Sequence, residues 1–319
     1  MSYKLIIAHG SNVYQPSIVD DIVWETERKG TPGKLTFKII GNDKIQFTEG
    51  DSVSFKLGKN DTPIFYGFIF SIKRDKEQIL SITAYDQLRY LKNKDTVQIK
   101  NMTATETIEM LAKDFQLQTG KLTNTKFKIE SKLEDNQTLF DIIQNALDLT
   151  LHNTKELYVL YDDFGKITLK NISEMKLNVA LDETSAENFD YETSIDQNTY
   201  NQIKLVYNNE TEGKREIYLA KDGSNINQWG VLQYFETLNE KGNAKNKADT
   251  LLKLYNQKTK NFTLKNVFGH TDVRAGSLIG VSLNLGDEKI NNYMLVESCK
   301  HTFSENLHTM DLVLKGDGF

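Results

Sequence analysis

Two stretches of this 319-residue chain decide its fold: Glu49-Gly50-Asp51-Ser52-Val53-Ser54-Phe55-Lys56-Leu57 and Ala275-Gly276-Ser277-Leu278-Ile279-Gly280-Val281-Ser282-Leu283. In each stretch a glycine turn leads into residues that alternate between apolar and polar. The surroundings match as well, because an alternating strand precedes each turn and a tyrosine, Tyr66 or Tyr293, follows it at nearly the same distance. The sequence therefore predicts an internal duplication.

The strands around the two turns share one pattern. Each tyrosine opens an apolar strand, and a closing strand follows at residues 79–84 or 307–314. Alternation with period two, bounded by Gly, Asn and Asp, is typical of antiparallel strands with one buried face, and several strands at this spacing favour a barrel or a sandwich. A coincidental glycine turn in two unrelated β segments is the alternative. The preceding alternating positions are Leu35, Phe37 and Ile39 in the first copy and Phe262, Leu264 and Asn266 in the second.

Composition and charge exclude several classes of protein. Hydrophobic residues make up 39% of the chain and charged residues 26%, and no stretch approaches the roughly 18 apolar residues that a membrane span needs. The formal net charge of −5 argues against binding to nucleic acid phosphates, which requires a basic face. We expect neither membrane insertion nor sequence-specific nucleic acid binding.

The first ten residues and the single cysteine indicate where the chain is made. The apolar run within residues 1–10 is too short for a secretory signal and is expected to form the first strand, so we expect synthesis in a cytoplasm. Cys299 cannot form an internal disulfide. Its place in an apolar strand predicts a small buried side chain rather than a nucleophile.

The middle of the chain changes from period two to a period of about 3.6. Thr103 and Glu106 form a capping box before an apolar helical stripe, and Thr138 with Asp141 begins a second helix. Residues 157–161 and 166–170 are expected to flank a tight hairpin turn. These elements predict a small α/β insert, and a further helix is expected near 243–256. The predicted domains are a first β-barrel (1–95), the α/β insert (96–180) and a second β-barrel that includes this helix (181–319).

Two groups of residues imitate catalytic or metal sites. His301 and His308, with Glu305 or Asp311, resemble a metal site, but a cross-strand histidine pair explains them better, because zinc sites on hairpins usually add a third His or Cys. Asp162 and Asp163 resemble the paired carboxylates of a glycosidase. Adjacent residues at a strand turn point in different directions, so a hairpin turn is the better interpretation.

The remaining candidates also favour structural roles. Residues 30–34 resemble a phosphate loop but lack the Walker A spacing, and residues 85–91 are expected to be a strand end that turns into a short helix. Trp24 and Trp229 are expected to anchor the core or an interface rather than to stack a ligand. We therefore assign no catalytic, cofactor-binding or metal-binding residue, no cofactor, and no enzymatic activity.

Four segments of the sequence resemble the XkdQ/YqbQ-type proteins of phage-like particles and contractile-tail bacteriocins, which are related in fold to the late control protein D and baseplate hub group. The resemblance spans nearly the whole chain. The segments that carry it are Ala84-Tyr85-Asp86-Gln87-Leu88-Arg89-Tyr90-Leu91, Leu139-Phe140-Asp141-Ile142-Ile143, Tyr200-Asn201-Gln202-Ile203-Lys204, and Cys299-Lys300-His301-Thr302-Phe303 with His308-Thr309-Met310-Asp311-Leu312.

The resemblance implies a structural baseplate hub of a contractile phage tail or a phage-tail-like bacteriocin. Relatives carry two tube-like β-barrel domains in each chain and form a trimeric, pseudo-sixfold ring between the tail tube and the central spike. The implied partners are two further copies of this chain, the tail tube or tube-initiator protein, the spike and other baseplate proteins, in an assembled tail particle. The alternatives are a tail-associated peptidoglycan hydrolase, which needs a cleft with two convergent carboxylates of raised pKa, and a carbohydrate-binding module, which needs exposed aromatic residues on one barrel face.

Overall fold

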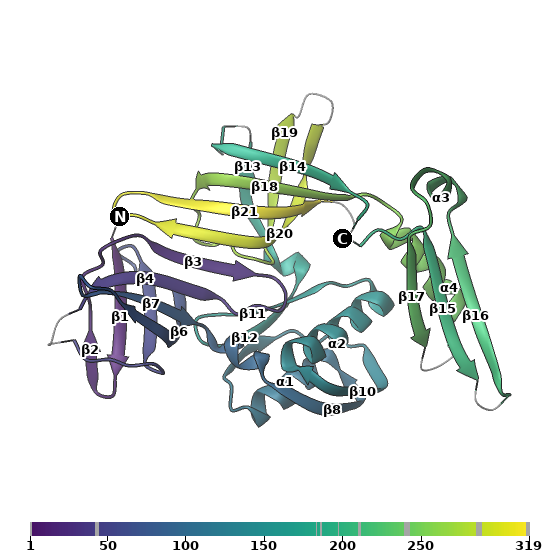
Figure 1. Cartoon of the computed structure of the whole chain (residues 1–319), viewed down its shortest axis with the longest axis horizontal. Helices are drawn as coiled ribbons and strands as arrows, with labels where there is room; N and C mark the ends of the chain where they lie inside the picture. The colour runs from purple at the N-terminus through teal and green to yellow at the C-terminus, as the bar shows by residue number, and fades with distance from the viewer. Residues whose placement is uncertain are drawn as a thin grey trace. The chain divides into compact units, whose positions relative to one another are not determined.

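The computed structural model describes residues 2–41, 45–182, 184–185, 187–196, 198–209, 212–238, 243–284 and 289–316 (Figure 1). It divides into two compact units. The first unit comprises Met1–Phe189 and Thr263–Leu314, and the second comprises Asp190–Phe262 and Lys315–Phe319. No helix in the described residues is long and apolar enough to cross a membrane.

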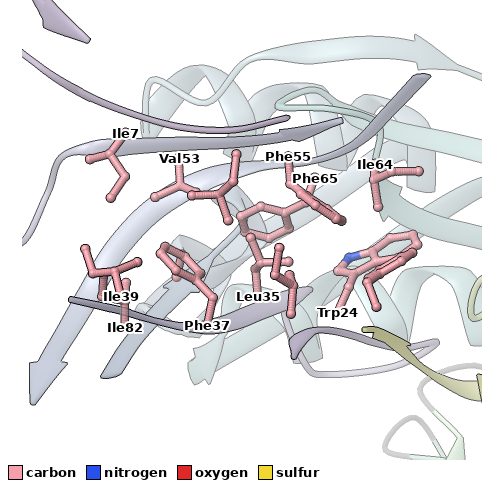
Figure 2. Packing of buried hydrophobic residues seen from close by; sticks show 14 of the residues in the cluster. Ile7, Trp24, Leu35, Phe37, Ile39, Val53, Phe55, Ile64, Phe65 and Ile82 are labelled. Carbon is pink, nitrogen blue, oxygen red and sulfur yellow. The ribbon is translucent and has the colours of Figure 1, made fainter. Parts of the chain in front are cut away.

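The N-terminal strands form an antiparallel sheet around an apolar core. Its long strand β6 contains Tyr66, so the tyrosine lies inside the strand rather than at its start. Alternate residues of β4 point inward as expected, because Leu35, Phe37 and Ile39 are almost fully buried. Figure 2 shows Ile7, Val53 and Phe55 facing Phe37, Ile39 and Ile82 across this core. The strands are β1 (Tyr3–His9), β2 (Asn12–Tyr14), β3 (Ile22–Glu27), β4 (Lys34–Ile40), β5 (Ser52–Leu57), β6 (Thr62–Arg74) and β7 (Ile79–Tyr85).

Strands from the C-terminal part repeat this arrangement. The first group runs in the order β3-β4-β7-β6-β5-β1, and the second runs β14-β18-β21-β20-β19-β13. Each position in the first order therefore has a counterpart in the second. One difference is direction, because β1 pairs antiparallel with β5 whereas β13 pairs parallel with β19. The strands are β13 (Lys176–Leu181), β14 (Asn188–Ser194), β18 (Thr259–Phe268), β19 (Leu278–Asn284), β20 (Lys289–Phe303) and β21 (His308–Gly316).

The two groups join into one continuous sheet. Ser298–Phe303 of β20 pairs antiparallel with β3, and Figure 1 shows β20, in yellow, beside β3, in purple. Phe303 extends into the N-terminal core, where its ring meets that of Phe55 at 5.0 Å. The guanidinium of Arg28 donates to both carboxylate oxygens of Glu297, at 2.8 and 2.9 Å, and reinforces the join.

Between the two groups lies the α/β insert, which contains both predicted helices. Thr103 caps α1 and exchanges both capping-box hydrogen bonds with Glu106, while Thr138 caps α2 through the backbone N–H of Asp141. The apolar faces of these helices pack into one buried cluster. The elements are the short helix η1 (Gln87–Lys92), β8 (Lys94–Thr103), α1 (Ala104–Asp114), β9 (Thr119–Leu122), β10 (Lys128–Thr138), α2 (Leu139–Thr154), β11 (Tyr158–Asp162), β12 (Ile167–Asn171) and the short helix η2 (Ile172–Met175).

The second unit is a three-stranded sheet with a helix on one face. Its strands are β15 (Gln202–Asn209), β16 (Lys214–Lys221) and β17 (Gln233–Leu238). The predicted helix is α4 (Ala244–Tyr255), and its buried Ala248 and Leu251 pack on the sheet. The helix α3 (Gly223–Trp229) was not predicted; it buries none of its residues and so offers no apolar stripe.

The structure is mainly β with an α+β insert, as predicted. The predicted boundary at 95/96 falls inside β8, and the boundary at 180/181 falls at the end of β13, which pairs with β19. Pairing in a sheet, and not continuity along the chain, groups these strands. The domain boundaries therefore stay predictions.

Candidate functional site

Three charged residues from distant parts of the first unit come together inside it. Asp86 follows β7, Asp162 ends β11, and Arg274 lies between β18 and β19. The two aspartates are buried, with 4% and 5% of their surface exposed, whereas Arg274 is partly buried. We call these three residues the junction cluster, because they link the N-terminal sheet, the insert and the C-terminal strands.

Asp86 is held by backbone N–H groups on both sides. One carboxylate oxygen accepts from the N–H of Gly33 at 2.9 Å, and the other accepts from the N–H of Leu88 at 3.0 Å and so caps η1. A Cβ atom at position 33 would lie only 2.4 Å from Asp86 Oδ2. Gly33 is thus required by the close approach of the loop to this carboxylate, not by phosphate binding.

The neighbouring Gln87 fastens the insert to the same loop. Its side-chain amide donates to the carbonyl oxygens of Gln118 and Gly165, at 2.9 and 2.7 Å, and its amide oxygen accepts from the N–H of Gln118 at 2.9 Å. All these bonds connect the start of η1 to backbone of the insert. The segment 85–91 therefore connects the sheet to the insert, and it has the strand end and the short helix that the sequence predicted.

Arg274 connects the C-terminal strands to the rest of the cluster. Its Nη1 donates to the carbonyl oxygen of Asp162 at 2.9 Å, and its guanidinium lies 4.2 Å from the ring centre of Tyr161. Its Nε and the Oδ2 of Asp162 are buried without a hydrogen-bond partner among the described residues. Next to it, the N–H of Ala275 donates to Thr26 Oγ1 at 3.0 Å, which ties the same segment to β3.

The electrostatics of the junction cluster follow from its burial. Burial raises the pKa of Asp162 to about 6, against the opposing effects of the Gly165 N–H and of Arg274. Burial, and then the nearby charge of Asp162, raise the pKa of Asp86 well above its usual value, while Arg274 and two backbone N–H groups oppose the rise. Burial thus disfavours the charged forms of Asp86 and Asp162, and the single positive charge of Arg274 compensates part of this cost.

The contacts of this pair of carboxyl groups bear on the hydrolase alternative. Their pKa values are raised, as a general acid requires, but both oxygens of Asp86 are engaged by backbone N–H groups. A pocket beside the cluster is lined in part by Trp24, Asp163 and Arg274, and neither Asp86 nor Asp162 is among its described lining residues. The described hydrogen bonds of Asp86 and Asp162 connect parts of the fold to one another.

The two histidines of the last hairpin form a buried cross-strand pair, as the sequence favoured. His301 Nδ1 lies 2.8 Å from His308 Nε2, and His301 Nε2 lies 2.8 Å from the carbonyl oxygen of Val273. A carbonyl only accepts, so Nε2 of His301 carries the proton, its Nδ1 accepts, and His308 Nε2 donates. Both rings are neutral in this arrangement.

The environment of the pair keeps it neutral. Burial, with the neighbouring His308, lowers the pKa of His301 to about 3, and burial lowers the pKa of His308 to about 4. The ring of His301 stacks on Trp24 at 4.9 Å, so the pair also lies against β3. Among the described residues no group of three or more metal-ligating side chains exists.

The other candidates have structural roles or remain open. Cys299 is buried, its pKa raised by burial, and it lies 3.1 Å from His301 Nε2. Residues 30–34 lead from the loop after β3 into β4, and Asp163 is exposed in the hairpin turn while Asp162 is buried. Trp24 is a core residue, whereas Trp229 ends α3 and is only partly buried.

Sequence reasoning missed the junction cluster. Asp86 lies in one of the segments that carry the family resemblance and Asp162 lies at a predicted turn, but no sequence motif marks Arg274. The usable signal was an aspartate directly before a short helix, which predicts a cap and hence burial. The meeting of the three residues depends on strand pairing over long sequence distances, and no local pattern encodes it.

Comparison with known proteins identifies relatives over nearly the full chain. A family model described as YQBQ-like matches residues 22–315. "Uncharacterized protein YqbQ" of Bacillus subtilis (strain 168) is 31% identical over 306 residues, which are 92% of this chain and 91% of that protein. "Phage-like element PBSX protein XkdQ" of the same strain is 32% identical over 308 residues, with coverage of 92% and 91%.

A solved structure shares the fold. The 43 kDa tail protein of prophage MuSo2 from Shewanella oneidensis superposes with a TM-score of 0.71 and covers 98% of each chain. Its sequence is 13% identical, so this likeness concerns the fold alone.

Proposed function

Since the chain belongs to the YQBQ-like family, we propose that it is the structural baseplate hub of a contractile phage tail or a phage-tail-like bacteriocin. A structural role in a tail or baseplate agrees with the phage-like element to which its relative XkdQ belongs. In this proposal three copies form a ring that joins the tail tube to the central spike and contacts other baseplate proteins. The ring assembles from chains made in the bacterial cytoplasm and becomes part of the tail particle.

One observation carries the proposal: the strand order β3-β4-β7-β6-β5-β1 recurs as β14-β18-β21-β20-β19-β13. A trimer of such chains presents six similar sheets. It can therefore meet a sixfold tube on one side and a threefold spike on the other, a change of symmetry that a chain with one sheet cannot provide as a trimer. The predicted domains 1–95 and 181–319 would each supply one tube-like barrel.

The described interior favours assembly over turnover. The charged groups buried in the first unit are used in contacts between its parts, as the junction cluster illustrates. The net charge of −5 is also compatible with a ring that lets nucleic acid pass without binding it.

Native mass spectrometry of the purified chain at increasing concentration tests the stoichiometry. We expect a discrete trimer, and cryo-electron microscopy of isolated particles should place three copies in one ring between tube and spike. Six copies per ring, or a position on the outside of the tail, would overturn the proposal.

An activity assay tests the hydrolase alternative. Purified chain incubated with peptidoglycan should release no soluble fragments above the level of a D162N variant. Release that depends on Asp162 would replace the structural proposal by an enzymatic one.

A further inference from the structure

Strand β20 serves two different partners along its length. Its first half pairs with β19, from Asn284↔Lys289 to Leu278↔Leu295. Two backbone hydrogen bonds close that ladder, from Gly276 N–H to Val296 O at 2.8 Å and from Val296 N–H to Ser277 O at 2.9 Å. Its second half, Ser298–Phe303, then pairs with β3.

Strand β6 is the counterpart of β20, and its first half behaves in the same way. Thr62–Phe68 pairs with β5. The same two closing hydrogen bonds follow, from Gly50 N–H to Ile69 O at 2.8 Å and from Ile69 N–H to Asp51 O at 2.9 Å. The equivalence of β6 and β20 therefore extends to individual backbone hydrogen bonds.

The second half of β6 differs, because it has a partner on one side only. Ser71–Arg74 pairs with β7. On the side away from β7, no strand of the described chain pairs with this segment, although the matching half of β20 pairs there with β3. A segment that repeats a paired strand and lacks its partner is an open sheet edge.

Strand β14 supplies the complementary edge. It occupies the position of β3 in the repeated order, next to β18 as β3 is next to β4. On its other side β3 pairs with β20, whereas β14 is the last strand of the sheet in the part of the chain that the structure describes. The sheet of each chain thus has β14, the equivalent of β3, at its edge. It also has one open segment, Ser71–Arg74 of β6, which is equivalent to the part of β20 that pairs with β3.

We propose that β14 of one copy pairs antiparallel with Ser71–Arg74 of β6 in the next copy, and so repeats between chains the join that β3 and β20 make within one chain. The inference rests on the ring proposed above. The contact is head-to-tail, so each copy pairs its own β14 with β6 of one neighbour, and its own β6 pairs with β14 of the other neighbour. Three copies close a ring in which joins within chains alternate with joins between chains.

Charge supports this pairing. Lys73 and Arg74 make the β6 edge basic. The strand β14 and the residue before it are acidic, with exposed Glu187, Asp190 and Glu192. Opposite charges across strands stabilise pairing, and like charges oppose it.

The join within the chain has the same polarity, because Glu25 of β3 lies opposite Lys300 of β20. An acidic β14 against the basic edge of β6 therefore repeats the charge pattern of the join between β3 and β20.

Charge reversal tests the proposal on the full chain by native mass spectrometry. K73E/R74E and D190K/E192K should each raise the dissociation constant of the trimer at least about tenfold, since like charges then face each other. Combining both pairs in one chain should restore the trimer, because every head-to-tail contact regains opposite charges. The control K94E/K100E changes the same net charge at exposed positions of β8 and should leave the trimer unchanged.

Cross-linking provides a second readout in assembled particles. A mixture of isotopically labelled and unlabelled chains, treated with a carbodiimide, should yield Lys73–Glu192 links between labelled and unlabelled copies. A trimer that survives both reversals and lacks these links overturns the β14–β6 contact while the proposed ring stands. Particles without any ring of three copies overturn the ring and the contact together.

Discussion

The two equivalent strand groups differ in what they bury. The N-terminal group encloses an apolar core, in which Leu35, Phe37 and Phe55 are almost fully buried. The C-terminal group buries a histidine pair and Cys299 and places Arg274 beside them. The same arrangement of strands thus encloses a core of apolar side chains in one group, and in the other it also contains polar side chains that contact adjacent parts of the fold. These polar groups lie where β20 meets β3 and the insert. The difference in buried residues between the two groups therefore arises from the contacts at this junction, because the strand order is the same in both.

Matched positions make the same point. The strand ends Ser71-Ile72-Lys73-Arg74 and Ser298-Cys299-Lys300-His301 align with each other. Ile72 packs partly buried against the apolar core, while Cys299 is buried beside the histidine pair. His301 is buried in the copy that has a partner on this edge, whereas the aligned Arg74 is exposed in the copy without one; Lys300 and Lys73 are exposed in both.

We expect a large effect on stability at the junction cluster. Arg274→Met removes the cation that compensates Asp86 and Asp162, and we expect a loss of about 3 kcal/mol in the free energy of unfolding, at the low end for a buried pair because Arg274 is partly exposed. Urea unfolding followed by Trp24 fluorescence, in a Trp229→Phe background, measures it. D162N added to this variant should recover part of the loss, because it removes an uncompensated carboxylate.

Arg89→Met is the matched control. Arg89 is a partly exposed arginine whose guanidinium lies 5.3 Å from the ring centre of Phe70, outside the junction cluster. Its loss should cost less than about 1 kcal/mol. Equal losses for the two arginines would show that the cluster has no special role.

A matched pair of core truncations compares the two groups directly. Leu35 and Leu264 are buried leucines in the equivalent strands β4 and β18. Each Leu→Ala change should lower the free energy of unfolding by about 2–5 kcal/mol through lost transfer energy and a residual cavity. If the first unit unfolds cooperatively, both variants shift the same urea transition. Two separate transitions would contradict this expectation.

The pH dependence should distinguish the polar interior from the apolar one. The folded-state pKa values of about 3 for His301 and about 4 for His308 lie below the unfolded value of 6.5. Stability from keeping the rings neutral is therefore complete above pH 6.5 and is lost as the pH falls toward 4, at about 1.4 kcal/mol per pH unit for each group. Asp162 acts in the opposite sense, since its raised pKa of about 6 makes the folded state gain relative stability as the pH falls from 6 to 4.

A variant separates the two contributions. The difference in unfolding free energy between the native chain and H308Q should shrink as the pH falls from 7 to 4, because only in the native chain does unfolding allow that ring to take up a proton. The control H152Q changes a histidine of α2 that lies outside the pair. A pH-independent difference for H308Q would mean that His308 is charged or exposed in the folded state.

The smallest expected effect concerns a surface link between the same regions. Lys29 Nζ lies 3.3 Å from Asp148 Oδ1 of α2, and both side chains are about 40% exposed, at 41% and 39%. Solvent and salt screen such a pair, so K29A should cost less than about 1 kcal/mol. Urea unfolding at low and high salt checks this. A loss as large as that of Arg274→Met would place the stabilising contact at the surface.

Local features were predictable from the sequence, and pairings over long distances were not. The alternation of Leu35, Phe37 and Ile39 predicted a half-buried strand, and the caps at Thr103 and Thr138 fixed where two helices begin, because neighbouring residues encode both features. The sequence did not predict the helix α3, because this helix has no apolar stripe. The sequence also predicted the duplication, but the β20–β3 join and the meeting of Arg274 with Asp162 depend on which strands lie side by side, which local patterns do not determine.

The double use of β20 has a mechanical consequence. A pull along this strand loads its ladders with β19 and β3 in shear, so many backbone hydrogen bonds must yield together before either sheet opens. The short β2 pairs with β1 only between Asn12 and Tyr14 and can be peeled away one bond at a time. A chain built in this way should resist force best along the axis of β20, the longest described strand.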